Sequence, residues 1–169
     1  LKISKTDLFA VVTDMADGRP SYIHLNVQAD PIRYLVVGSA MSILSLPQEI
    51  DGRVYGDGGL TDAIPLGFAE HLGADEIWVV LNTPTGHRES RASWWFTSRL
   101  ARSSAERALL AASAGVRNAV LSEIEQRSDL VVIRPYLPLP VGCFTRNPEK
   151  MCLLYNMGKK AGVAQAKAY

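Results

Sequence analysis

Three short, continuous apolar runs stand out along the chain, at residues 8–12, 77–81 and 130–133. Each run is rich in β-branched residues and is bounded by polar or turn-forming residues. Continuous runs of this length are typical of strands that are buried on both faces of a sheet. Residues 22–27 instead alternate between apolar and more polar positions, which predicts a strand with one face toward solvent.

Helical patterns separate these runs. Asp30 and Pro31 predict a helix start, because the first can cap a helix and the second suits its first position. A second predicted helix covers about 65–72 and ends at Gly73. A third covers roughly 93–126, with an apolar stripe of Leu109, Ala112, Val116, Val120 and Ile124. A last helix is predicted to begin at Asn147-Pro148-Glu149. The alternation of strands and helices in the second half predicts a layered α/β domain with a largely parallel sheet.

Composition places the chain among ordinary globular proteins. It has 169 residues, of which 47% are hydrophobic and 21% charged, and its formal net charge is +1. These values exclude a disordered or fibrous chain and argue against a nucleic-acid partner. The longest uncharged run, Tyr34 to Gln48, is shorter than the roughly 20 apolar residues of a membrane-spanning helix. We therefore expect a cytoplasmic or peripheral membrane location.

Metal and cofactor chemistry has little support in the sequence. Cys143 and Cys152 lie nine residues apart, which is not the spacing of a metal knuckle, and we expect two unpaired thiols. His24, His71 and His87 are scattered without ligand spacing. We expect neither a metal site nor a cofactor.

The most informative segment is a glycine-framed aspartate. Asp57 is followed by Gly58 and Gly59 and precedes a predicted helix start at Pro65. Glycine allows positive φ angles and a close approach of the backbone to a ligand. On the tripeptide alone, a plain turn is the simpler interpretation, because Asp-Gly turns are common.

The wider context of this aspartate resembles the patatin-like phospholipase family. The resemblance rests on three consecutive blocks: Val54-Tyr55-Gly56-Asp57-Gly58-Gly59, then Ala63-Ile64-Pro65-Leu66, then Gly73-Ala74-Asp75-Glu76-Ile77. Weaker likenesses lie at residues 8–19, at Ser39-Ala40 with Leu46-Pro47, and at 129–140. The family fold implies a three-layer, largely parallel sheet flanked by helices. Residues 1–169 would be the C-terminal part of a single such domain, which is therefore incomplete.

The resemblance also implies an activity. Patatin-like enzymes hydrolyse lipid acyl esters with a Ser-Asp dyad, and the family's aspartate corresponds to Asp57, with Gly58 and Gly59 as motif support. A carboxylate with a reference pKa near ~3.9 is a weak base for an alcohol. It requires hydrogen-bond reach, shelter from water and nearby oxyanion donors. The implied partners are a lipid or other acyl-ester substrate and a membrane surface.

The nucleophile of that dyad is absent from this sequence. None of the thirteen serines has a glycine two positions before it, and Ser39, which comes nearest, is flanked by Val37 and Met41. The family's Gly-x-Ser-x-Gly elbow precedes its aspartate block, so we expect the serine on a missing upstream segment. The start at Leu1, which is not Met, favours this interpretation. The alternative is a catalytically dead, patatin-like lipid-binding or regulatory module.

Three further interpretations follow from the sequence. The pair Asp14 and Asp17 resembles the double-aspartate motif of haloacid-dehalogenase-like phosphatases, in which two acids bind one magnesium ion. That motif has one residue between its acids, whereas two intervene here. Trp94-Trp95-Phe96 lies among arginines and suggests a membrane interface, a core element or a lid. An incomplete sheet would expose a strand edge, so we expect a homo-oligomer or a complementary N-terminal segment.

Overall fold

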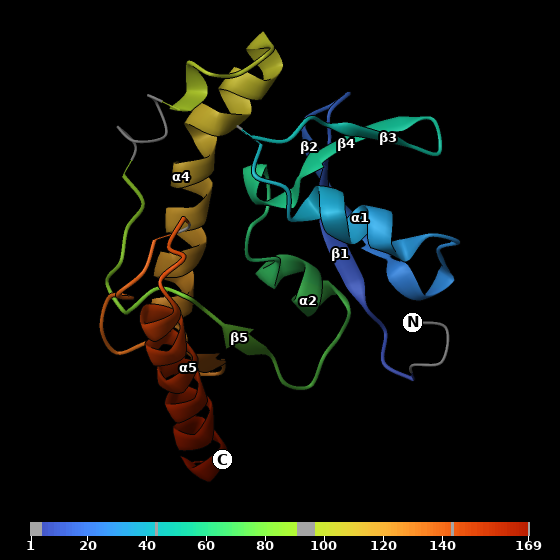
Figure 1. Ribbon diagram of the computed structural model, residues 1–169. Helices are drawn as coiled ribbons and strands as arrows, with labels where there is room; N and C mark the ends of the chain where they lie inside the picture. The colour runs from blue at the N-terminus through green and yellow to red at the C-terminus, as the bar shows by residue number, and fades with distance from the viewer. Residues whose placement is uncertain (1–4, 43, 91–96, 143, 169) are drawn as a thin grey trace. The chain divides into compact units, whose positions relative to one another are not determined.

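The computed structural model describes residues 5–42, 44–90, 97–142 and 144–168 (Figure 1). Within it the chain forms two compact units. The first unit comprises Leu1–His71 and Glu89–Val120, and the second comprises Leu72–Arg88 and Leu121–Tyr169. The aromatic cluster at 94–96 lies outside the described residues, so its expected roles stay predictions.

The first unit is built on a four-stranded antiparallel sheet with the order β2-β1-β4-β3. Its strands are β1 (Phe9–Asp14), β2 (Arg19–His24), β3 (Gln48–Ile50) and β4 (Arg53–Asp57). A turn that contains Gly18, with φ of 69°, joins β1 to β2. In the pairing of β1 with β4, Val12 lies opposite Asp57. The register therefore places Asp57 beside the most deeply buried strand of the unit.

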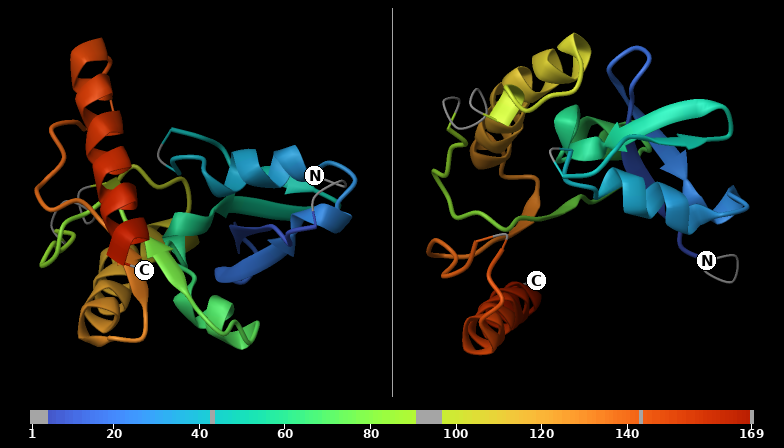
Figure 2. Two further views of the ribbon diagram at one scale, coloured as in Figure 1. Left: turned by 90° about the horizontal axis from the view of Figure 1, so that it is seen from below. Right: turned by 45° about the horizontal axis from the view of Figure 1, so that its top comes forward.

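Helix α1 (Pro31–Gly38) packs on β1 and β4, and the views in Figure 2 agree that it lies along one face of the sheet. Pro31 occupies the predicted first turn, although the side chain of Asp30 makes no capping hydrogen bond. Tyr34 and Val37 are the buried residues of α1. They join the core, which consists of Ala10, Val12, Leu25, Tyr34, Val37, Ile50 and Tyr55.

The second unit contains a short parallel pair, β5 (Trp78–Val80) and β6 (Val131–Ile133), and the long helix α5 (Pro148–Ala168). α5 begins as the sequence predicts, because the side chain of Asn147 accepts a hydrogen bond from the backbone N–H of Lys150 at 3.0 Å. It packs against β6. No helix among the residues that the structure describes is long and apolar enough to cross a membrane.

The predicted three-layer, largely parallel sheet is wrong. The structure instead combines the four-stranded antiparallel sheet with the small parallel pair. A continuous apolar run specifies burial but not strand direction, and here a tight turn folds β1 back on β2. The hairpin of β3 and β4 was not predicted. The run at 77–81 is not buried on both faces either, since Trp78 is 42% exposed and Val80 is 73% exposed.

The described residues also form two short 3₁₀ turns, η1 (Leu25–Val27) and η2 (Gly58–Leu60), and the helices α2 (Leu66–His71) and α4 (Ser104–Gln126). α2 is followed by Gly73 with φ of 71°, in agreement with the predicted helix stop. The predicted apolar stripe of α4 is rotated from the observed one. The buried positions of α4 are Glu106, Leu110, Ser113, Ala114, Leu121 and Ile124. Because this buried face contains the polar residues Glu106 and Ser113, apolar periodicity does not predict it.

Candidate functional site

Asp57 ends β4 and serves as the N-cap of η2. Its backbone is held by β1, because the hydroxyl of Thr13 donates a hydrogen bond to the carbonyl oxygen of Asp57 at 2.6 Å. Thr13 is fully buried, and its hydroxyl also lies 2.9 Å from that of Thr61, just beyond η2. Asp57 therefore lies at a strand end, as the sequence predicts, on a backbone fixed from both sides.

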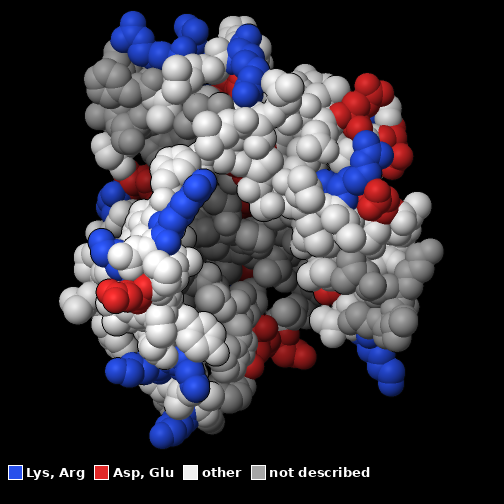
Figure 3. All heavy atoms as spheres, in the orientation of Figure 1, with Lys and Arg blue, Asp and Glu red and all other residues white. Residues whose placement is uncertain are grey.

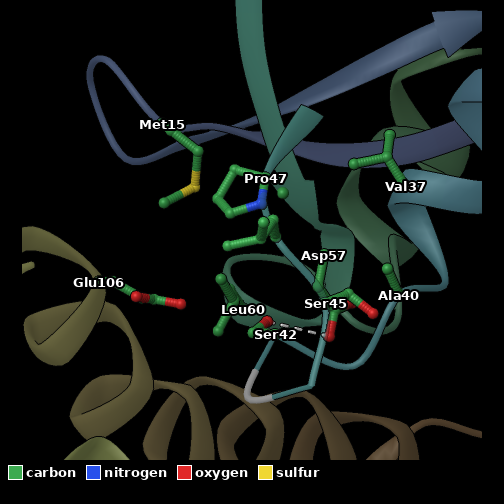
Figure 4. Close-up of a pocket in the computed structure, with 11 residues that line it drawn as sticks. Met15, Val37, Ala40, Ser42, Ser45, Pro47, Asp57, Leu60 and Glu106 are labelled. Carbon is green, nitrogen blue, oxygen red and sulfur yellow. Dashed lines mark hydrogen bonds between the residues drawn. The ribbon is translucent and has the colours of Figure 1, made fainter. Parts of the chain in front are cut away.

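Both carboxylate oxygens of Asp57 accept hydrogen bonds within the first unit. Oδ1 accepts from the backbone N–H of Gly59 at 2.8 Å. Oδ2 accepts from the hydroxyl of Ser42 at 3.3 Å, the contact drawn as a dashed line in Figure 4. These two donors orient the carboxylate and stabilise its charged form.

The glycines around Asp57 serve close packing. None of Gly56, Gly58 and Gly59 has a positive φ. Glycine is therefore not needed at these positions for its access to positive φ angles, as the sequence suggested. A Cβ on Gly58 would collide with the backbone carbonyl oxygen of Val11 in β1. One on Gly59 would come within 3.1 Å of Asp57 Oδ1. Small residues therefore let η2 press against β1 while its first turn reaches the carboxylate.

One side of the Asp57 carboxylate borders a very small cavity. A cavity of only about 10 Å³ lies there, walled by Met15, Leu60 and the loop that follows α1, with Glu106 of α4 facing it (Figure 4). Such a volume holds about one water molecule. This space therefore has no room for a substrate.

The other side opens into a cavity of about 390 Å³. The residues that line it come from β1, α1, the glycine turn and α4: Ala10, Val11, Tyr34, Leu35, Gly38, Ser39, Asp57, Gly58, Gly59, Asp62, Ala63 and Arg117. Asp62 is held by the hydroxyl of Tyr22, which donates to it at 2.6 Å. This volume falls within the usual range of small-molecule sites, ~300–1,000 Å³. The cavity can therefore admit part of a substrate beside the carboxylate.

Burial raises the pKa of Asp57 above its usual range. The hydrogen bonds from Gly59 and Ser42 and the positive charge of Arg117 act in the opposite direction without cancelling this effect. A raised pKa makes the carboxylate a stronger proton acceptor than an exposed aspartate. This property is found at catalytic carboxylates and also at buried structural ones.

Arg102 holds the loop that carries Ser42. Its Nη1 donates to the carbonyl oxygens of Ser42 and Ser45 at 2.9 and 3.0 Å. Glu106, which is 3% exposed, accepts from the backbone N–H of Arg102 at 2.7 Å and pairs with its Nη1 at 3.4 Å. The loop after α1 is thereby attached to α4, at the point where Ser42 reaches Asp57.

The serine nearest to Asp57 was not found by sequence reasoning. Ser39, which the sequence singled out, donates its hydroxyl to the carbonyl oxygen of Leu35 at 2.7 Å and so ends α1. Ser42 contacts Asp57 instead. Its only sequence signal is its place just after the Ser-Ala pair of the family resemblance.

The two acids considered for a phosphatase stabilise a turn. Asp14 accepts from the backbone N–H of Ala16 at 2.9 Å and lies 3.3 Å from Arg53, and Asp17 accepts from the N–H of Arg19 at 2.9 Å. Among the described residues, no three His, Cys, Asp or Glu side chains gather as metal ligands would. The geometry therefore lends the magnesium interpretation no support.

No protein-family model matches the chain, and a search of curated proteins finds no match either. The patatin-like resemblance thus rests on the residues quoted for it. The geometry around Asp57 can be interpreted independently of that resemblance. It comprises a carboxylate that is oriented by two hydrogen bonds and lines both a very small cavity and a larger one.

Proposed function

We propose that Asp57 is the general base of a lipid acyl hydrolase that uses a Ser-Asp dyad, with the nucleophilic serine on a segment outside the printed sequence. The observation that carries this proposal is the position of the carboxylate, oriented by two hydrogen bonds beside a cavity of about 390 Å³. Its raised pKa supports proton acceptance from a hydroxyl. The substrate class, a lipid or other acyl ester at a membrane surface, follows from the family resemblance.

In the proposed reaction the serine oxygen forms a bond to the acyl carbon as its proton passes to Asp57. The alcohol part of the ester leaves when its bond to that carbon breaks, and Asp57 returns the proton to it. Water then attacks the acyl-enzyme, again with Asp57 as the base, which restores the serine and releases the acid. The hydrogen bond from the Ser42 hydroxyl is an example of Asp57 Oδ2 accepting from a hydroxyl group.

One observation favours the alternative of a non-catalytic lipid-binding or regulatory module. Both oxygens of Asp57 already have donors within the chain, Gly59 and Ser42. A carboxylate satisfied in this way can be a purely structural N-cap of η2. The two interpretations differ in whether Asp57 is needed for turnover.

The test is ester hydrolysis by the full-length protein that contains this chain, with a p-nitrophenyl acyl ester as substrate. Asp57→Asn is expected to lower kcat by about 10²–10⁴-fold, the usual contribution of a general base. Asp30→Asn is the matched control, because Asp30 is exposed and makes no capping hydrogen bond. A fluorophosphonate label should attach to one serine outside residues 1–169.

Three results would contradict the proposal. Equal activity of the parent and Asp57→Asn would leave the carboxylate a structural role. Labelling of Ser42, together with loss of labelling in Ser42→Ala, would move the nucleophile into this chain. Absence of both activity and labelling in the full-length protein would favour the non-catalytic module.

A further inference from the structure

The second unit contains a cavity of its own, with a volume of about 260 Å³. It lies where the carboxyl ends of the parallel strands β5 and β6 meet the face of α5. Its lining consists of Val80, Leu81, Asn82, Ile133, Arg134, Pro135, Leu139, Leu154, Met157, Gly158 and Ala161. The crevice outside the carboxyl ends of parallel strands is a common place for ligands in α/β proteins.

The walls of this cavity suit an alkyl chain. Apart from Asn82 and Arg134, every residue that lines it is apolar or glycine. Dry apolar cavities of about 150 Å³ accept benzene, so this larger space can accept a longer hydrocarbon. Met157 adds an adaptable side chain to the wall.

Arg134 does not make the interior of the cavity a charged site. Its Nε and Nη2 donate to the carbonyl oxygens of Thr83 and Pro84 at 3.1 and 2.7 Å, and its Nη1 pairs with Glu125 at 3.2 Å. Each nitrogen of the guanidinium therefore has a protein acceptor, and the side chain is only 13% exposed. A ligand inside the cavity gains from apolar burial, without an ion pair to this arginine.

The wall formed by α5 leaves room and carries positive charge. Gly158 and Ala161 are small, and a Cβ on Gly158 would meet no atom within 4 Å. The helix contains four lysines and one glutamate: Lys150, Lys159, Lys160, Lys167 and Glu149. Basic side chains outnumber acidic ones over the surface where α5 lies (Figure 3). A ligand whose head group remains outside the cavity would therefore meet a positive surface.

We propose that this cavity binds the alkyl chain of a single-chain anionic amphiphile, a long-chain carboxylate, with its head group against the basic surface of α5. The site lies within the second unit and does not depend on the function proposed for Asp57, which belongs to the first. Apolar burial supplies the affinity, and the lysines select the charge of the head group.

The experiment is calorimetric titration of the full chain with dodecanoate below its micellar concentration. Gly158→Leu places a side chain in the cavity and should weaken binding about tenfold or more, since it excludes several methylene groups. Gly162→Leu is the matched control. Gly162 is a second glycine of α5 with open space around it, but it does not line the cavity. Both changes favour the helix, and circular dichroism checks that each variant folds.

The head group is tested separately. The double variant Lys159→Gln with Lys160→Gln should weaken dodecanoate binding while leaving binding of the neutral dodecyl maltoside unchanged. Ala161→Phe, a second blocking change, should weaken both ligands. The proposal is overturned if dodecanoate shows no saturable binding, or if Gly158→Leu and Gly162→Leu weaken it equally. Equal affinity for the two amphiphiles in the parent chain would overturn the role of the anionic head.

Discussion

Arg102 donates a hydrogen bond to the carbonyl oxygen of Ser42 at 2.9 Å, across sixty positions of the sequence. The same nitrogen donates to the carbonyl oxygen of Ser45, so one guanidinium fixes the loop after α1 to the segment just before α4. That loop presents the hydroxyl of Ser42 to the carboxylate of Asp57. Arg102 thereby acts on Asp57 through Ser42.

Replacing Arg102 by Met should release this loop. The hydrogen bond from Ser42 lowers the pKa of Asp57, so its loss is expected to raise that pKa further. The change also removes a partner of the buried Glu106, and we expect unfolding to become easier by about 1–3 kcal/mol. Carboxyl ¹³C titration and urea unfolding measure the two effects. Arg107→Met, an exposed neighbour on α4, should change neither; an unchanged Asp57 pKa in Arg102→Met would contradict this coupling.

Gly58→Ala should strongly destabilise the first unit. The added methyl group would overlap the backbone carbonyl of Val11, which cannot rotate away as a side chain would. The expected cost is about 3 kcal/mol or more, seen as a lower urea midpoint. Gly67→Ala in α2 is the control, because its Cβ would meet nothing within 4 Å and alanine favours a helix. Equal midpoints for the two variants would show that η2 and β1 do not pack this closely.

The titration of Asp57 should make stability depend on pH. Because its folded pKa is raised, the folded state binds the proton more tightly than the unfolded state does. The resulting stabilisation is complete below the unfolded pKa, near ~3.9, and is lost as pH rises through the folded value. Relative to Asp57→Asn, the parent should therefore lose unfolding free energy across this window. Parallel curves for the two proteins between pH 3 and 7 would show an unshifted carboxylate.

Glu125 should show the opposite dependence. The side chain of Arg88, 2.8 Å away, and the backbone N–H of Gly86 lower the pKa of Glu125 to about 2. A lowered pKa stabilises the folded protein above the unfolded value, and this contribution disappears as pH falls toward 2. Glu125→Gln is therefore expected to lower the free energy of unfolding at pH 7, and to have the same free energy of unfolding as the parent near pH 2. Glu123→Gln is the control, because the side chain of Glu123 is 52% exposed. If Glu125→Gln is still less stable than the parent at pH 2, the loss comes from packing and not from the charge of Glu125.

Local features of the chain were predictable where neighbouring residues determine them. Asn147 caps α5, Pro31 lies in the first turn of α1, and Gly73 follows α2 with a positive φ. The strand end at Asp57 belongs to the same group. Each depends on a few consecutive residues whose backbone preferences agree.

Pairing and burial were less predictable. An apolar run such as 77–81 indicates a strand, yet its exposed Val80 shows that an apolar sequence does not ensure burial. The buried face of α4 contains Glu106 and Ser113, whose polar groups are satisfied by Arg102 and by the backbone of Leu110. These hydrogen-bond partners become known only from the folded structure. From their residue types alone, Glu106 and Ser113 would be expected on the surface.

The sequence by itself determined the glycine-framed aspartate, the helix starts and stops, and the near-neutral charge. Tertiary structure decided the antiparallel order of the first sheet, the contact of Ser42 with Asp57, and the need for glycine opposite Val11. The reason is physical. Caps and turns depend on the backbone preferences of adjacent residues, whereas strand direction and side-chain partners depend on which distant segments reach one another when the core closes.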